Sequence, residues 1–415
     1  MRSPVLSRRK PERLQELPRT NDNVKIGLVS PYDWSYPGGV RDHVRHLADE
    51  FIAVGHDVRI LAPASGKKGK LSEPNVYKMG GTTPVPINGS IARITLNPAL
   101  GRQVRRVLQR ERFDVVHLHE PLLPGLSLTV LRFSRALNVG TFHAFARAGM
   151  TSTPYLAYAS AYPFLRRYFQ RLAGRIAVSS AAYNFVSHYF DGDYRIIPNG
   201  VNLENFSPSV LPFPQYMDGK QNILFVGRFE KRKGAKFLLR AIPLLRERFP
   251  DTRFIFVGEG RLRSGFQQFV ERHGWQDVIF TGYVPDEDKP RYFASAHVFC
   301  APAIGGESLG IVLLEAMASG KPVVATAIEG YATVVRDGVD GLLVPPRDSE
   351  ALAYSIGRLL QNEPLRRQLA RNGQQTARQY AWPQVARRVL DYYAELLAEG
   401  AAYEVVRHAS SRTFL

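Results

Sequence analysis

The stretch HVFCAPAIGGESLGIVLLEAMASGKPVVAT, residues 297–326, decides the fold. Its apolar run at 297–302 predicts a strand, a Gly-rich loop leads into an apolar helical stretch, and the run at 322–326 predicts a second strand. A strand that is followed by a helix and by another apolar strand is the repeating unit of a parallel α/β sheet.

The same alternation extends toward both ends of the chain. Predicted strands form a first series at residues 24–30, 57–63, 114–119 and 139–145, and a second series at residues 222–227, 253–258, 278–282, 297–302, 322–326 and 341–345. A Pro- and Asn-rich segment at 198–219 separates the two series. The sequence therefore predicts an α/β protein with two doubly wound, Rossmann-like domains that face a central cleft.

The length of 415 residues exceeds what one core of ordinary size accommodates and agrees with two domains. We expect a flexible basic arm, an N-terminal domain, a C-terminal domain, and a final helix that returns to the N-terminal domain and ends in a tail, at residues 1–22, 23–205, 206–380 and 381–415. In such sheets ligands bind outside the carboxyl ends of the strands, so the loops that follow the strands are the candidate sites.

The charge is strongly positive and unevenly divided. The chain carries 55 Lys and Arg against 37 Asp and Glu, a net charge of +18, and residues 1–200 hold 28 of the basic and 14 of the acidic side chains. Such a balance favours nucleic acid, an anionic membrane or a phosphorylated substrate as partner. Nucleic acid is disfavoured, because the basic side chains lie on predicted helices and do not alternate with stacking aromatic residues on a sheet face.

Cysteine usage and hydropathy indicate the compartment. The single cysteine, Cys300, leaves no internal disulfide, as is typical of cytoplasmic proteins. No uncharged run is apolar enough to span a bilayer, and we expect no secretory signal at the start.

A basic loop follows the first strand of the second series. Gly227 and Gly234 bracket Arg228, Arg232 and Lys233 at a predicted strand-to-helix turn. Backbone N–H groups at the start of a helix, together with Arg and Lys, form a site for a diphosphate. The alternative is a basic surface loop.

Two glutamates lie in the stretch quoted first. Glu307 belongs to the Gly-rich loop, and Glu315 belongs to a helix that is apolar on all sides, so its buried carboxylate needs a partner. Eight residues of helix would separate them by about 12 Å, roughly the reach from a sugar past a diphosphate to a ribose. The alternative is a surface residue at 307 and a structural pair between Glu315 and an arginine.

Other strand-end residues are further candidates. Val284 follows a strand where backbone groups would meet a nucleobase, and Gly39 opens a helix that would face a phosphate or a sugar. His143 ends a strand and is either a polar group of the cleft or a core histidine. His117 and His119 share one face of a strand, but no third ligand accompanies them in the sequence, so no metal site is expected.

Taken together, these motifs resemble the retaining family-4 glycosyltransferases of the GT-B fold. The likeness extends from residue 24 to about residue 382, and it rests on GGV at 38–40, TFH at 141–143, IPNGV at 197–201, GRFEKRKG at 227–234 and GESLGIVLLEAMASGKPVV at 306–324. Within that family the chain is most similar to the phosphatidylinositol α-mannosyltransferases, through GGTTPVPINGSIARI at 80–94, FDVVHLHEP at 113–121 and GGESLGIVLLEAMASG at 305–320.

The resemblance implies a role for each matching residue. Arg228 and Lys233 would bind the donor diphosphate and stabilise it as a leaving group, Glu307 and His143 would contact the hexose, and Glu315 would bind the ribose. Further donor contacts would come from Gly39 against the phosphates, from the backbone of Val284 against the base, and from backbone N–H groups of Leu309, Gly310 and Ile311. The resemblance implies front-face attack without a placed protein nucleophile, no obligatory metal, and a divalent ion as a stimulant at most.

The acceptor side departs from the mannosyltransferase pattern. In that subgroup the TFH histidine precedes a hydroxyl-rich stretch that ends in a lysine for the acceptor phosphate, whereas this chain has AFARAGM, with Arg147 one position early. The acidic residue expected before GGV is replaced near Ser35, with Asp33 close by, and Tyr32 in the same loop is a candidate for acceptor contact. Nucleotide-sugar binding is unaffected, and the acceptor stays open.

A basic amphipathic helix is predicted at residues 101–113, where Val104, Val107 and Leu108 alternate with arginines. Such a helix is suited to lie on anionic lipid, although a solvated helix face and an ordinary core helix are the alternatives. The candidate membrane and acceptor contacts are Lys67, Lys68, Lys70, Arg102, Arg105 and Arg106.

The expected function is transfer of a hexose to a membrane lipid in a bacterial cell, with mannose from GDP-mannose and phosphatidylinositol as first choices. The alternatives are UDP-glucose- or UDP-galactose-dependent glycosylation of diacylglycerol and a soluble transferase that acts on a sugar or polysaccharide. The expected partners are a nucleotide sugar and an anionic membrane surface, and the oligomeric state stays open. We expect a cytoplasmic protein that is peripherally associated with the inner face of the cell membrane.

Overall fold

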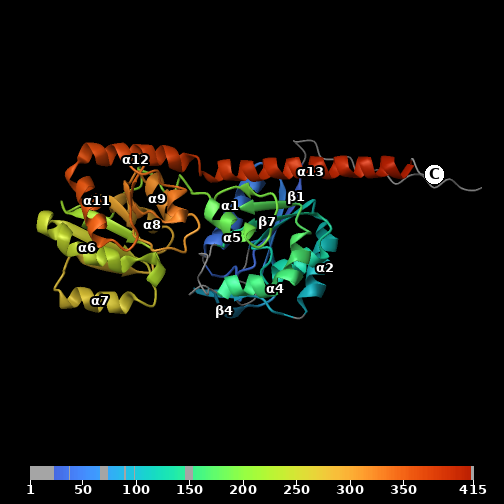
Figure 1. Cartoon of the computed structure of the whole chain (residues 1–415), viewed down its shortest axis with the longest axis horizontal. Coiled ribbons are helices and arrows are strands. Elements are labelled where there is room, and N and C mark those ends of the chain that lie inside the picture. The colour runs from blue at the N-terminus through green and yellow to red at the C-terminus, as the bar shows by residue number, and fades with distance from the viewer. Residues whose placement is uncertain are drawn as a thin grey trace, which may run out of the picture.

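The computed structural model describes residues 23–36, 38–65, 73–87, 90–97, 99–144 and 153–412. Two α/β domains lie side by side, with α12 (Glu363–Arg378) along one and α13 (Trp382–Arg412) along the other (Figure 1). The predicted arm at 1–22 and the candidate residues Lys67, Lys68, Lys70 and Arg147 lie outside the described residues.

The N-terminal domain is built on a seven-stranded parallel sheet with the order β3-β2-β1-β6-β7-β8-β9, and β4 and β5 form a separate antiparallel hairpin. The strands and helices are β1 (Lys25–Val29), α1 (Gly39–Ala53), β2 (Asp57–Ala62), β3 (Val76–Lys78), β4 (Thr83–Ile87), β5 (Ser90–Ile94), α2 (Leu100–Glu111), β6 (Val115–His119), α3 (Leu126–Phe133), β7 (Leu137–Phe142), α4 (Thr153–Phe169), β8 (Gly174–Ala177), α5 (Ser180–Ser187) and β9 (Arg195–Ile196). The hairpin, the edge strands β3 and β9 and the internal strand β8 were not among the predicted strands, because each is short or carries little apolar periodicity.

The C-terminal domain repeats this plan with a six-stranded parallel sheet of order β12-β11-β10-β13-β14-β15. Its elements are η1 (Pro214–Tyr216), β10 (Gln221–Val226), η2 (Lys231–Lys233), α6 (Ala235–Arg248), β11 (Thr252–Val257), α7 (Arg263–Arg272), β12 (Val278–Gly282), α8 (Lys289–Ser295), β13 (Val298–Ala301), α9 (Ile311–Ala318), β14 (Val323–Thr326), α10 (Glu329–Ala332), β15 (Leu342–Val344) and α11 (Ser349–Gln361), followed by α12. The predicted α/β class with two doubly wound domains is confirmed.

Alternation along the strands explains why each sheet is covered on both faces. In β10, Ile223 and Phe225 point into the core cluster beneath α6 and α11, whereas Leu224 and Val226 point into the cluster that contains α9. Side chains of a strand alternate between the two faces of its sheet, so a strand that is apolar at every position is buried on both sides.

Two chain crossings connect the domains, and they lie against each other. The N–H of Val201, in the first crossing, donates to the carbonyl of Tyr380, in the second, at 2.8 Å. A Cβ on Gly200 would lie 2.4 Å from the ring of Trp382, so this turn has no room for a side chain. Helix α13 then packs Val389 and Tyr393 into the core of the N-terminal domain.

Candidate active site

The order of strands reverses at one point in each sheet, and Gly39, the basic loop at 227–234 and Glu307 follow strands at these two points. The reversal lies between β1 and β6 in the first sheet and between β10 and β13 in the second. A crevice forms outside the carboxyl ends of such a strand pair, because the helices that follow the two strands cover opposite faces of the sheet.

The basic loop after β10 is held tightly against the loop after β13. Gly234 has a φ of +70°, and a Cβ there would lie 1.8 Å from the carbonyl oxygen of Pro302. Only glycine satisfies both constraints, so the turn fixes the short helix η2 that carries Arg232 and Lys233. Arg228 is about half exposed and pairs with Glu230 at 3.0 Å.

Glu307 is the acceptor of two of these cations. Lys233 Nζ lies 2.9 Å from Glu307 Oε1, and Arg232 pairs with the same oxygen and donates to the Gly306 carbonyl at 3.0 Å. Burial of Glu307 opposes its ionisation, but Lys233 and Arg232 more than offset this and lower its pKa. The structure thus joins the predicted diphosphate loop to the predicted hexose residue, and it adds an ion pair of Arg232, to which the resemblance gave no individual role.

Glu315 also has a cation as its partner, although not the arginine of the alternative prediction. Lys289 Nζ of α8 donates to Glu315 Oε1 at 2.6 Å, while the buried Oε2 has no hydrogen-bond partner among the described residues. Helix α9 begins only at Ile311, so the span of 12 Å, which assumed helix throughout, does not apply between Glu307 and Glu315.

The N-terminus of α9 faces the other domain. Gly310 precedes this helix with a φ of +81°, and a Cβ there would lie 2.5 Å from the Tyr331 ring. The first N–H groups of a helix lack intrahelical acceptors, which makes Leu309 to Ile311 suitable for an anion or a hydroxyl. A Cβ on Gly39, at the start of α1, would lie 4.0 Å from Ile311 Cδ1, so the predicted donor contacts of the two domains meet here.

The predicted nucleobase contact lies after β12. Val284 is partly buried against the core, and its neighbour Tyr283 is 66% exposed. The backbone of Gly282 has a φ of +80°, and a Cβ there would lie 2.8 Å from Glu259 Oε1. This turn therefore has no room for a side chain at Gly282, and the contact between the backbone of Val284 and a nucleobase stays a prediction.

His143 stands at the centre of a histidine cluster in the N-terminal wall. Its ring Nε2 and His119 Nδ1 are 2.9 Å apart, and its backbone N–H donates to Glu120 Oε1 at 2.8 Å. Burial lowers the pKa of His143 well below its usual value, and repulsion from His43 and His117 adds to this, so the ring is neutral at physiological pH. Burial also disfavours the charged form of Glu120 and raises its pKa to about 7, although the hydrogen bonds that it accepts from the backbone of His143 and Ala144 lower the pKa in part.

The cluster corrects one inference from the sequence, which found no third ligand near His119. His43 of α1 joins His119 and His143, and one ring nitrogen from each lies within 4.8 Å of the other two. Within the described part of the chain, this is the group whose side chains could hold a metal ion. His117 is not a member: its ring contacts Thr141 Oγ1 at 2.6 Å and the Tyr393 hydroxyl of α13 at 2.5 Å.

The acceptor candidates before α1 have different surroundings. Asp33 is buried and accepts hydrogen bonds from Thr82 Oγ1 at 2.7 Å and from the N–H groups of Ser35 and Ser65, so it ties three loops together and cannot replace a cleft acid. Burial raises the pKa of Tyr32, and the charge of Glu120 raises it further.

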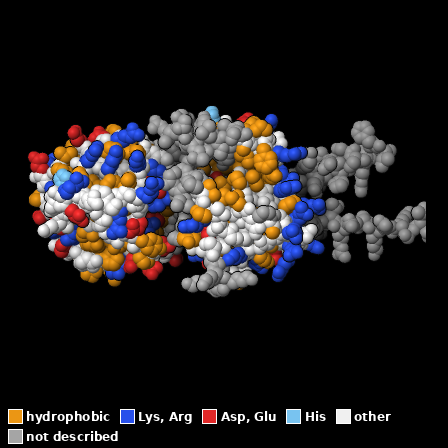
Figure 2. Space-filling view, turned by 90° about the horizontal axis from the view of Figure 1, so that it is seen from below, with side chains coloured by type: hydrophobic (Ala, Val, Ile, Leu, Met, Phe, Trp, Pro, Cys, Tyr) orange, Lys and Arg blue, Asp and Glu red, His pale blue; other side chains and the backbone are white. Residues whose placement is uncertain are grey.

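The surface expected to meet a membrane is polar rather than amphipathic. In α2, Val104 and Val107 pack into the core, whereas Arg102, Arg105 and Arg106 are exposed. Figure 2 shows Lys and Arg side chains along the end of the N-terminal domain where Figure 1 places α2. The apolar face of this helix is therefore covered by the protein itself, so only its basic face is available to anionic lipid. No described helix combines the length and the hydropathy needed to cross a bilayer.

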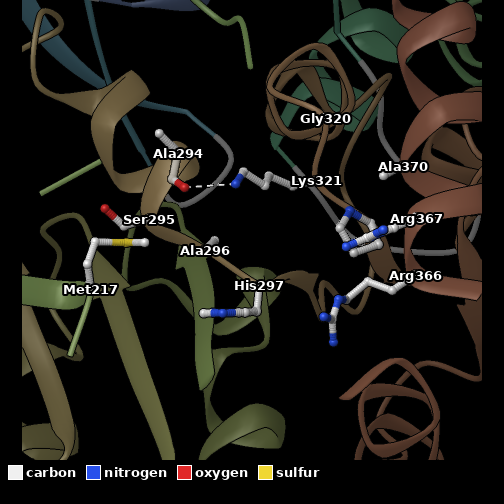
Figure 3. A pocket seen from close by; sticks show the side chains of 11 residues that line it. Met217, Ala294, Ser295, Ala296, His297, Gly320, Lys321, Arg366, Arg367 and Ala370 are labelled. Atoms are coloured by element: carbon white, nitrogen blue, oxygen red, sulfur yellow. Dashed lines mark hydrogen bonds between the residues drawn. The ribbon is translucent and has the colours of Figure 1, made fainter. Parts of the chain in front are cut away.

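A separate cavity of 230 Å³ lies in the C-terminal domain near the amino ends of β13 and β14, away from the donor loops (Figure 3). Lys321 donates to the Ala294 carbonyl at 2.7 Å, and Arg366 donates to the Leu359 carbonyl at 3.1 Å. These carbonyls lie at the ends of α8 and α11, where cations complement the helix dipole, so the basic lining has a structural explanation.

Comparison with known proteins agrees with this geometry. The family described as "Glycosyltransferase Family 4" matches residues 37–205, and "Glycosyl transferases group 1" matches residues 214–376. The phosphatidyl-myo-inositol mannosyltransferase of Mycobacterium leprae (strain TN) is 40% identical over 92% of this chain and 100% of its own length. The chain belongs to the family-4 glycosyltransferases. It is thus an enzyme, and a glycosyltransferase.

Further comparisons support the family and the fold. The phosphatidyl-myo-inositol mannosyltransferase of Mycobacterium tuberculosis (strain ATCC 25618 / H37Rv) is 37% identical over 92% of this chain and 100% of its own length. The sucrose-phosphate synthase of Thermosynechococcus elongatus is only 22% identical, but it superimposes with a TM-score of 0.73 over 91% of this chain and 100% of its own. The predicted GT-B fold is therefore confirmed.

Proposed function

We propose that the enzyme transfers mannose from GDP-mannose to phosphatidylinositol with retention at the anomeric carbon. The observation that carries this proposal is the similarity, over nearly the whole chain, to proteins named phosphatidyl-myo-inositol mannosyltransferase, which are 40% and 37% identical. The facing of Gly39 and Ile311 across the cleft supports a donor site between the two domains.

The pairing of Glu307 suggests how the donor is received. Without donor, Lys233 and Arg232 neutralise the Glu307 carboxylate. A diphosphate carries more charge than a carboxylate and would compete for these cations, which frees Glu307 Oε1 to accept hydrogen bonds from hexose hydroxyls. In this proposal the same cations, with Arg228, stabilise the negative charge that develops on the leaving diphosphate.

The neutral His143 would contribute polarity without charge. One ring nitrogen faces His119, which leaves the other for a hydroxyl of the hexose. Because Arg and Lys supply the positive charge, the proposal keeps the expectation that no metal is obligatory for transfer. It also keeps front-face attack by the acceptor, without a protein nucleophile.

The exposed arginines of α2 support a peripheral position on the inner face of the cell membrane. Arg102, Arg105 and Arg106 would contact anionic headgroups, each contributing about 1 kcal/mol near such a surface. Docking would therefore be electrostatic and sensitive to salt.

The test is transfer from labelled GDP-mannose to vesicles of phosphatidylinositol and neutral lipid, with the anomeric configuration of the product read by NMR. UDP-glucose and UDP-galactose with diacylglycerol vesicles form the comparison arm. Lys233→Gln should abolish most transfer, whereas Lys231→Gln, an exposed neighbour outside the Glu307 pair, should retain it. Transfer only in the comparison arm, or an inverted product, would overturn the proposal.

A further inference from the structure

His143, which contacts the hexose in the proposed mechanism, shares a cluster with His43 and His119, to which that mechanism gives no contact with the substrate. His43 and His119 are 4% and 0% exposed, and His143 is partly buried at the end of β7. They come from α1, β6 and the segment after β7, so the fold brings together three side chains that are far apart in the sequence.

Two nitrogens of this group lack partners. His43 Nδ1 and His119 Nε2 are buried, and neither has a hydrogen-bond partner among the described residues. Leaving a buried polar atom unsatisfied costs about 1–3 kcal/mol. A ligand that binds either of these nitrogens would remove this cost at that atom.

The spacing fits a metal ion. One nitrogen from each ring lies within 4.8 Å of the others, and the closest pair, His119 Nδ1 and His143 Nε2, is 2.9 Å apart. Zinc binds imidazole nitrogen at about 2.0–2.1 Å, which places the nitrogens of a tetrahedral site about 3.4 Å from one another. Small ring rotations therefore suffice to form the site.

We propose that His43, His119 and His143 bind one divalent ion of the zinc class, with the fourth position open toward the cleft. Three imidazoles suit Zn²⁺, Co²⁺ or Ni²⁺, whereas Mg²⁺ prefers oxygen ligands. The open position follows from the partial exposure of His143, which gives the ion a path from solvent.

The proposed site is distinct from any magnesium that accompanies the donor diphosphate. Its ligands lie in the N-terminal domain, whereas Arg228, Lys233 and Glu307 belong to the C-terminal domain. An ion there would hold the His143 ring and so compete with its contact to the hexose. Metal binding requires neither donor nor acceptor. The metal site can therefore be refuted while the proposed function holds, and the proposed function can be refuted while the metal site holds.

The experiment is a titration of the metal-free, untagged full chain with Co²⁺, followed by absorption spectroscopy. We expect one equivalent to produce the intense visible bands of tetrahedral cobalt, and Zn²⁺, but not Mg²⁺, to displace it. His43→Asn and His119→Asn should weaken binding at least tenfold, whereas His273→Asn, an exposed histidine of the other domain, should bind like the wild type.

A second measurement does not depend on whether the variants fold. A ligand present at about 100 times its dissociation constant stabilises the native state by about 2.7 kcal/mol, so Zn²⁺ should raise the melting temperature of the wild type and Mg²⁺ should not. Octahedral or absent cobalt bands with no zinc-specific stabilisation would refute the site, as would wild-type affinity in both folded variants.

Discussion

Replacing Glu315 by glutamine tests the assignment of the ribose site. Lys289 holds Oε1 at 2.6 Å, and the buried Oε2 has no partner among the described residues, so Oε2 is the atom left for a ligand hydroxyl. A hydrogen bond to a charged group contributes about 1.5–3 kcal/mol, against about 1 kcal/mol for a neutral pair. The change should therefore weaken nucleotide binding by about 1–2 kcal/mol, or roughly 5- to 30-fold in Kd.

The assay compares two ligands in two proteins by calorimetry. GDP should bind the wild type more tightly than 2′,3′-dideoxy-GDP does, and Glu315→Gln should bring the two affinities close together, because the glutamine loses only the contact to the ribose hydroxyls. Glu271→Gln, at an exposed position on α7, is the matched control and should behave like the wild type.

The affinity for GDP alone does not test the contact between Glu315 and the ribose. A lower affinity for GDP could come from a disturbed fold, since Glu315 is buried beside Lys289. If the ratio of the two affinities is the same in wild type and in a folded Glu315→Gln protein, Glu315 does not bind the ribose, whatever the absolute affinities are.

Three further changes test the site and its support. His119→Leu removes the partner of the His143 ring and should lower kcat about tenfold in EDTA, with little effect on the donor KM. His119→Asn should restore part of the lost kcat. Equal rates for both variants would contradict a role of His119 in positioning His143. Gly234→Ala should destabilise the fold by more than about 2 kcal/mol in urea unfolding, because its Cβ would meet a carbonyl oxygen at a positive φ, whereas Gly265→Ala, with open space in a helix, should stabilise by about 0.5–1 kcal/mol. Burial lowers the pKa of Lys321 to about 8, so the unfolded chain binds more protons than the folded chain between about pH 8 and pH 10.5. The free energy of unfolding should therefore rise with pH across that window. Lys321→Met should remove this rise and add about 1–2 kcal/mol to the free energy of unfolding at pH 7, and an unchanged pH profile would contradict the lowered pKa.

The fold and the donor loops could largely be predicted from the sequence. Each predicted strand of the two doubly wound sheets is an apolar run, and each candidate donor loop directly follows such a run. The pattern of neighbouring residues along the chain was therefore enough to predict both. The basic loop at 227–234 and the two glutamates were singled out as donor-site candidates this way, since glycines at strand-to-helix turns mark where a ligand approaches the backbone.

The partners of these residues could not be predicted. Lys289 reaches Glu315 from 26 positions away, and His119 meets His143 from 24 positions away. Nothing in the local sequence around Lys289 distinguishes it from a solvated lysine. A signal for the histidines was present in the strand ends at 119 and 143, which neighbouring parallel strands bring to the same edge, but His43 lies on a helix and gives no such signal.

Helix α2 shows most clearly which properties follow from the local sequence and which depend on tertiary contacts. Its sequence establishes that one face is apolar and the other basic, because side chains repeat every 3.6 residues around a helix. Whether protein or lipid covers the apolar face depends on what packs against it, and the tertiary structure buries Val104 and Val107 in the core and leaves the arginines outside. By itself the sequence determined most of the strands, the charge and the position of the candidate donor loops, because these depend on neighbours along the chain. Only the tertiary structure decided the ion pairs, the histidine cluster and the covered face, because these depend on contacts between distant segments.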